Sequence, residues 1–68
     1  MQHANDNLPR LMSPREAASA TSLSRPALYY LSGRGQFPKP VRITEKRIAF
    51  VRTEVMNWID DRIAARAA

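Results

Sequence analysis

The chain has 68 residues, a formal net charge of +5 at pH 7 and no cysteine. So short a chain buries only about 60% of its unfolded surface, which predicts one small domain without a deep catalytic cleft. The missing cysteines exclude a disulfide framework and a cysteine-based zinc site, and an apolar content of 44% argues against wholesale disorder.

The excess of positive charge lies in one segment. Residues 34–52 carry six basic residues against the single acidic Glu45, whereas residues 1–33 contribute +1 and residues 53–68 contribute −1. Such a concentration favours a polyanionic partner. Membrane adsorption would need the bases on one face of an amphipathic helix, but the prolines and β-branched residues of this segment predict an extended chain. Nucleic acid is therefore the expected partner.

The first nine residues are expected to form a mobile tail (residues 1–9) before a domain that spans residues 10–66. They lack the basic start and apolar run of a signal peptide, and no stretch approaches the ~20 apolar residues of a membrane span. We therefore expect a cytoplasmic, nucleoid-associated protein without a membrane partner. His3 is the only histidine, so no metal site is expected.

Two short capped helices are predicted to follow the tail. Ser13 can accept a hydrogen bond from the amide of Glu16, whose side chain can reach back, and Pro14 suits the first helical position. This capping box predicts a helix over about residues 14–20, with Leu11 packing just before it. The apolar face of the helix is made of small residues: Ala17, Ala18 and Ala20.

The second helix is predicted over about residues 25–32. Ser24 is placed to cap it, and Pro26 is tolerated in its first turn. Gly33 would end the helix and Gly35 would let the chain reverse. Two capped helices joined by a tight turn form the helix-turn-helix pattern.

The 100° step between helical residues divides this second helix into two faces. Leu28 and Leu31, with one side of Ala27, face the core. The outer face carries no acidic residue and consists of Arg25, Pro26, Tyr29 and Tyr30. Such a face is unusual for a surface that meets only water, so we interpret it as a binding face.

Two β-prone runs, residues 41–43 and 48–51, predict a small hairpin with a turn between them. The two prolines before it suit a sheet edge, because proline cannot donate to a ladder. Alternation along the first run turns Val41 and Ile43 toward the core and Arg42 outward.

The last predicted element is a helix that Thr53 caps and that runs through about residue 65. An apolar stripe with i, i+4, i+8 spacing would pack it on the core: Val55, Ile59 and Ile63. Trp58 beside the stripe and Phe50 in the preceding strand are interpreted as core residues, because two large aromatic side chains supply much of a small interior.

Residues 23–31, Leu-Ser-Arg-Pro-Ala-Leu-Tyr-Tyr-Leu, and residues 37–43, Phe-Pro-Lys-Pro-Val-Arg-Ile, carry a family resemblance. They resemble the DNA-binding core of AlpA-type prophage regulators and small excisionases, compact relatives of the MerR-type winged helix. Those chains commonly read Leu-Ser-Arg-Ser-Thr-Ile-Tyr-Arg-Leu, a glycine, then Phe-Pro-Lys-Pro-Val-Arg-Leu. The resemblance covers about residues 10–63 and implies a mainly α-helical winged helix-turn-helix with a small antiparallel β-hairpin.

The resemblance implies double-stranded DNA as the partner, with helix 25–32 in the major groove and a wing at about residues 41–51 on the backbone or in the minor groove. Arg25 is the expected base reader, because a guanidinium can bond bidentately to guanine. The other basic residues would neutralise phosphates. The predicted DNA-binding residues are Ser24, Arg25, Pro26, Ala27, Tyr29, Tyr30, Arg34, Lys39, Arg42, Lys46 and Arg47.

Two positions depart from the family pattern. Pro26 stands where relatives have a serine, which removes a hydroxyl from the first turn of the helix. Thr44 and Glu45 stand where relatives have a Gly-rich tip. Because Glu45 would repel phosphate, contacts at the tip would rest on Lys46 and Arg47.

The expected function is sequence-specific DNA binding in transcription regulation. In the family this activity also serves prophage excision, in which an excisionase bends DNA for a recombinase or integrase, and the sequence does not separate the two. A third hypothesis is a protein-interaction adaptor or anti-repressor. Self-association on tandem sites is expected, because so small a module reads few base pairs. No catalytic grouping of side chains is present, so an enzyme, a cofactor and a small-molecule ligand are not expected.

Overall fold

The computed structural model describes residues 8–66, which form three helices and three short strands. In chain order they are β1 (Leu11–Met12), α2 (Pro14–Thr21), α3 (Arg25–Gly33), β2 (Val41–Arg42), β3 (Ile48–Val51) and α4 (Arg52–Ala65). This is the mainly helical winged helix-turn-helix architecture that the sequence predicted. Most of the predicted tail, including His3, lies outside the described residues.

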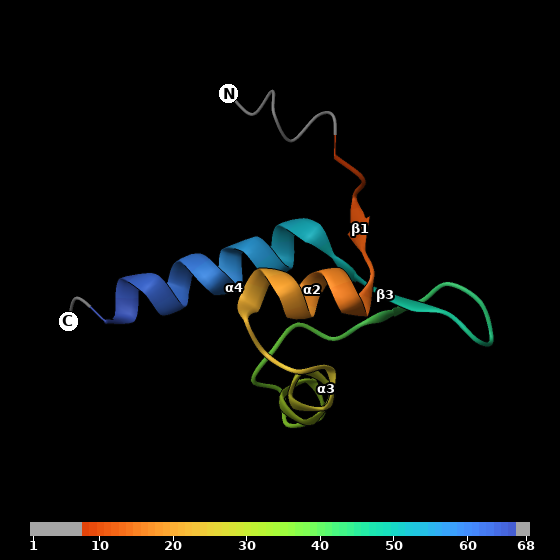
Figure 1. Ribbon diagram of the computed structural model, residues 1–68, viewed down its shortest axis with the longest axis horizontal. Coiled ribbons are helices and arrows are strands. Elements are labelled where there is room, and N and C mark those ends of the chain that lie inside the picture. The colour runs from red at the N-terminus through yellow and green to blue at the C-terminus, as the bar shows by residue number, and fades with distance from the viewer. Residues whose placement is uncertain (1–7, 67–68) are drawn as a thin grey trace.

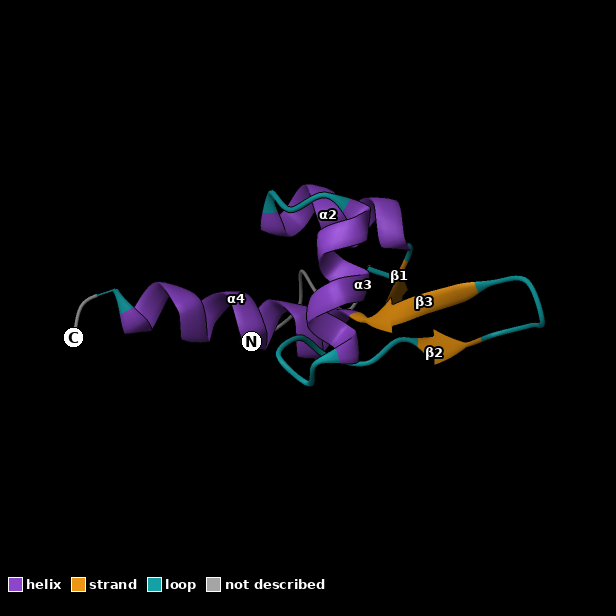
Figure 2. Cartoon of the chain, turned by 90° about the horizontal axis from the view of Figure 1, so that it is seen from below, coloured by secondary structure: helices purple, strands orange, loops and turns teal. Residues whose placement is uncertain are grey.

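The helices and the hairpin surround one small core. α2 and α3 form the helix-turn-helix pair, α4 follows β3 and extends away from the body, and the β2–β3 hairpin projects from the opposite side (Figures 1 and 2). Buried side chains from β1, all three helices, β3 and the segment before β2 meet between these elements. They are Met12, Ala17, Leu28, Phe37, Phe50 and Val55.

Both predicted serine caps are confirmed. The hydroxyl of Ser13 accepts a hydrogen bond from the amide of Glu16 at 3.0 Å, and that of Ser24 accepts one from the amide of Ala27 at 3.2 Å. Each bond satisfies an amide that has no partner within the first helical turn. Between the helices, Ser22 adopts a left-handed conformation with φ of 63°, so the chain turns there without a glycine.

The sheet is three-stranded and antiparallel, with the order β1-β3-β2. β1 was not predicted, because two residues are too few to show an alternating pattern. Met12 lies opposite Phe50 in this strand pair and is buried, whereas Leu11, which the sequence suggested as the packing residue, is only partly buried. The sheet thereby anchors the hairpin to the N-terminal segment.

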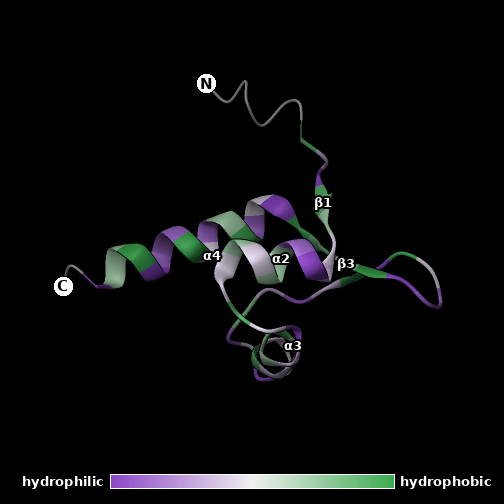
Figure 3. Ribbon diagram, in the orientation of Figure 1, coloured by the Kyte–Doolittle hydropathy of each residue, from purple (hydrophilic) through white to green (hydrophobic). Residues whose placement is uncertain are grey.

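The prediction that Val41 and Ile43 pack on the core is wrong. Their exposed fractions are 38% and 50%. The outer part of the hairpin projects past the helices, so no described element covers either of its faces (Figure 1). Within the hairpin, only Ala49 and Phe50 of β3 are buried. Figure 3 shows hydrophobic residues along β3 and hydrophilic residues at the tip of the hairpin loop.

The predicted cap of the last helix is also wrong. α4 begins at Arg52, directly after β3, with Val51 as a cap residue that makes no side-chain cap bond. Thr53 lies exposed inside the first turn. At the other end Ile63 is 52% exposed, because the last turns of α4 run past the body, and Trp58 is half-buried against the core.

Arg52 ties the N-terminal segment to two helices. Its Nε donates to the carbonyl of Pro9 at 2.6 Å, and its Nη2 donates to the Glu16 carboxylate at 2.7 Å. Its backbone amide donates to the carbonyl of Arg10 at 2.8 Å. The Glu16 side chain, which the sequence predicted to reach back toward its own cap, is thus the partner of Arg52. One base of the positive segment is therefore used within the fold.

Arg52→Ala should lower the free energy of unfolding by about 1–3 kcal/mol, because it removes two hydrogen bonds that one charged side chain makes to distant segments. Glu16→Gln should cost less than about 1 kcal/mol, since an ion pair beside water contributes little. The side chains of Arg52 and Glu16 are 12% and 47% exposed. Urea unfolding of both variants measures the two losses of stability. Equal losses would contradict the prediction that the Arg52 side chain contributes more than the charge of Glu16.

Candidate nucleic-acid interface

The outer face of α3 is open to solvent. Arg25, Pro26, Tyr29 and Tyr30 are all exposed, as their helical positions predicted, while Ala27 is half-buried. Viewed from below, α3 stands in front of the other helices and the hairpin extends beside it (Figure 2). α3 is therefore presented as a protruding, neutral-to-basic ridge.

Positive charge flanks this ridge at both ends. Arg25 is the first residue of α3 and Arg34 follows its last residue, and nine helical residues are about 13 Å long. The Arg34 guanidinium lies 5.5 Å from the centre of the Tyr30 ring, a cation–π distance that stacks the two side chains together. Tyr29 lies between the two charged ends.

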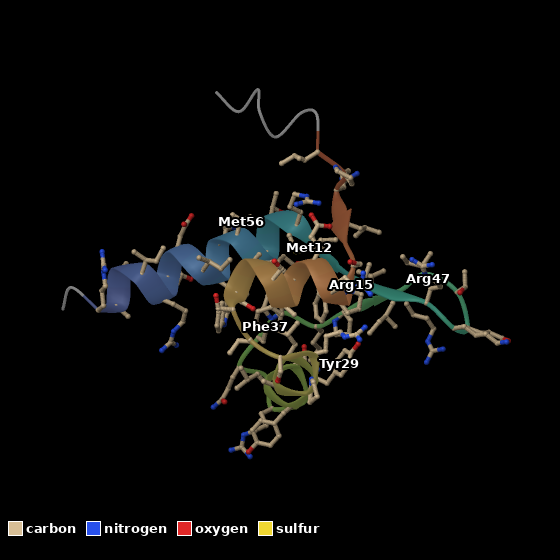
Figure 4. All side chains as sticks on the ribbon, viewed as in Figure 1. Met12, Arg15, Tyr29, Phe37, Arg47 and Met56 are labelled. Carbon is tan, nitrogen blue, oxygen red and sulfur yellow. The ribbon has the colours of Figure 1, made fainter. Side chains whose placement is uncertain are left out.

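The hairpin holds the next group of predicted residues. Arg42, Lys46 and Arg47 are exposed on it, away from the body of the domain, as Figure 4 shows for Arg47. The Thr44 hydroxyl accepts from the amides of Lys46 and Arg47 at 3.2 and 3.1 Å. A threonine side chain thus organises the turn of the hairpin. Arg42 donates through Nη1 to the carbonyl of Glu45 at 3.3 Å.

Lys39 connects the helix to the hairpin. A groove of about 370 Å³ runs between α3 and the segment that leads into β2, and Lys39 and Pro40 form one wall of it. Tyr29 and Gly33 line the α3 side. The predicted residues therefore lie on the helix, beside the groove and on the hairpin, rather than being scattered.

The predicted interface did not include Arg15, an exposed cation of α2. Arg15 lies in the first turn of α2, on the side of that helix that faces the hairpin (Figure 4). The count of charge by segment did not point to Arg15, because this residue lies outside residues 34–52. Its place two residues after the Ser13 cap was the available signal, since the first helix of a helix-turn-helix crosses the DNA backbone.

No group of three or more histidine, cysteine or acidic residues within residues 8–66 could hold a metal ion. None of the described helices is long and apolar enough to cross a membrane. Every buried side-chain nitrogen or oxygen in the same residues has a hydrogen-bond partner.

Comparisons with known proteins agree with the family resemblance carried by residues 23–31 and 37–43. Residues 10–63 match the family described as "Prophage CP4-57 regulatory protein (AlpA)". The chain is 35% identical over 57 residues to "Uncharacterized protein ORF88" of Enterobacteria phage P4, which covers 84% of this chain and 65% of that protein. It thus spans less than two thirds of the length of this relative. No solved structure matches the chain significantly. The match over nearly the whole described domain shows that the chain belongs to the AlpA family of prophage regulatory proteins.

Proposed function

We propose that this protein is a sequence-specific, double-stranded DNA-binding regulator of transcription that acts in the cytoplasm on the nucleoid. The observation that carries the proposal is the exposed face of α3, free of acidic residues, beside a projecting hairpin with three bases. Helices of this size fit the major groove. α3 would enter that groove, and the hairpin would contact the adjoining backbone or minor groove.

The exposed residues are proposed to act in two ways, some by contacting the bases and others by contacting the DNA backbone. Arg25 at the start of α3 would bond to guanine, while Tyr29 and Tyr30 would reach phosphates and sugars. Pro26 and the exposed side of Ala27 offer apolar contact, for example to a thymine methyl group. The DNA backbone that separates the major groove from the minor groove would lie along the groove of the protein beside Lys39.

The affinity for DNA should depend steeply on salt. Within residues 34–52, five basic residues remain exposed once Arg52 is engaged within the fold: Arg34, Lys39, Arg42, Lys46 and Arg47. If all five neutralise phosphates, log affinity should fall with log salt at a slope of roughly −4 to −5. Fluorescence anisotropy with a labelled random duplex measures this slope. Failure to bind random duplex at low salt would favour a partner protein, as for an adaptor or anti-repressor.

Copies of the protein on tandem sites are part of the same proposal, because one helix reads only a few base pairs. Selection of bound duplexes from a random library, followed by footprinting, would give the operator and the number and spacing of bound copies. Strong bending of the footprinted DNA next to a recombinase or integrase site would assign the protein to excision instead of transcription.

A further inference from the structure

The segment that joins α3 to the hairpin, residues 34–40, is held in place from both sides. It begins with a defined helix end: the Gly35 amide donates to the carbonyl of Ser32 at 3.1 Å and the Gln36 amide to that of Leu31 at 2.8 Å. This pair of bonds is a Schellman motif, and Gly35 supplies the required positive φ of 75°. We call residues 34–40 the connector.

Ser32 makes the first tie to the connector beyond this helix end. It is 6% exposed and is the only buried polar residue in the described part of the chain. Its hydroxyl donates to the carbonyl of Pro38 at 2.7 Å. A buried hydroxyl costs free energy unless it is hydrogen-bonded, and an alanine there would need no partner. The hydroxyl therefore serves to hold one particular point of the connector.

Trp58 of α4 makes the second tie. Its Nε1 donates to the carbonyl of Gln36 at 2.8 Å. Between the two tied carbonyls the Phe37 ring enters the core, 4.9 Å from the Trp58 ring and 5.4 Å from the Phe50 ring, both edge to face. Figure 4 shows Phe37 between the helices. The connector is thus fixed to α3 on one side and to α4 on the other.

The connection matters because the two proposed DNA contacts lie on separate elements. Arg25 is on α3, and the hairpin that carries Arg47 projects from the other end of the connector. Among the side-chain hydrogen bonds of the described residues, the Ser32–Pro38 bond is the one that joins α3 to the connector. Two contacts on one ligand reinforce each other only when the link between them matches their spacing.

We propose that Ser32 is a positioning residue for DNA binding. Its hydroxyl fixes the arm of the hairpin to α3, so that Arg25 and Arg47 engage one duplex at the same time. This inference rests on the proposed DNA-binding function. It assigns no DNA contact to Ser32 itself, because the side chain is buried.

Ser32→Ala should weaken binding of the selected duplex by roughly tenfold, within the range of coupling between linked groups. The variant should keep its far-UV circular dichroism at the assay temperature. The exposed Ser19 of α2 provides the matched control, and Ser19→Ala should bind as the wild type does.

Combined variants separate positioning from a general loss of structure. If Ser32→Ala misplaces the hairpin, Arg47 no longer contacts the duplex properly. The double variant Ser32→Ala with Arg47→Ala should then lose little more binding free energy than either single variant, whereas the losses of Ser32→Ala and Arg25→Ala should add in full. Trp58→Phe removes the other tie while keeping an aromatic ring. It should show the same dependence on Arg47→Ala, and it carries the test if Ser32→Ala does not fold.

Two results would overturn the inference. One is wild-type affinity in folded Ser32→Ala, and the other is a loss that adds in full to that of Arg47→Ala. Both leave the proposed function intact. Failure of the wild-type protein to bind any duplex would instead refute the proposed function, so the two failures are distinguishable.

Discussion

Phe37→Ala should remove most of the folding stability of this domain. Phe37 is buried and makes edge-to-face contacts with Phe50 and Trp58. Truncating a buried phenylalanine costs about 3–5 kcal/mol. A chain of 68 residues has a total stability of only roughly 3–10 kcal/mol. The expected result is a large drop in the melting temperature, or a chain that is unfolded when it is purified, measured by far-UV circular dichroism.

Two further variants calibrate this prediction. Phe37→Leu keeps an apolar side chain, so it should cost less than the alanine variant. Tyr30→Ala removes an aromatic ring that is exposed on α3, and it should change stability by at most about 0.5 kcal/mol. A Phe37→Ala protein that melts close to the wild type would show that the aromatic cluster does not hold the core together.

Arg25→Ala should weaken the preference for the selected duplex. A bidentate contact from arginine to guanine contributes about 1–3 kcal/mol of discrimination against the wrong base pair. The exposed Arg25 side chain lies in the first turn of α3, the part of a recognition helix that reaches base edges. The selected duplex should therefore lose affinity while random duplex keeps nearly all of it. Competition titrations with the two duplexes measure the ratio.

Lys46→Ala is the matched control for Arg25→Ala. Lys46 lies on the hairpin and is proposed to contact phosphate, so its loss should weaken all duplexes alike and reduce the salt slope by about 1. Equal losses of selected and random DNA in Arg25→Ala would refute base reading by this residue. The proposal for the hairpin would not be affected by that outcome.

The starts of the first two helices were predictable because capping is local. Ser13 and Ser24 each bond to an amide three residues further on, and both bonds are present. The end of α3 was predicted to within one residue, but the left-handed glycine that closes the helix is Gly35, whereas Gly33, which was predicted to end it, is still helical. The outer face of α3 followed from helical periodicity alone.

The other errors concern contacts between distant segments. Thr53 has the right chemistry for a cap, but α4 begins one residue before it, at Arg52, whose side chain bonds to Pro9 and Glu16 across the fold. Val41 and Ile63 fit the apolar pattern of buried residues, yet both are exposed. The pattern shows which face of an element is apolar and does not show whether another element covers it.

The family, the helix-turn-helix with its hairpin and the basic residues proposed to meet DNA could be predicted from the chain's residues, because these depend on residue identity and short-range spacing. The packing of the folded chain sets which of the basic residues remain available and how α3 is joined to the hairpin. Arg52 is drawn into an internal contact, and Ser32 is buried against Pro38. Both outcomes depend on which surfaces meet when the chain packs, which no local pattern specifies.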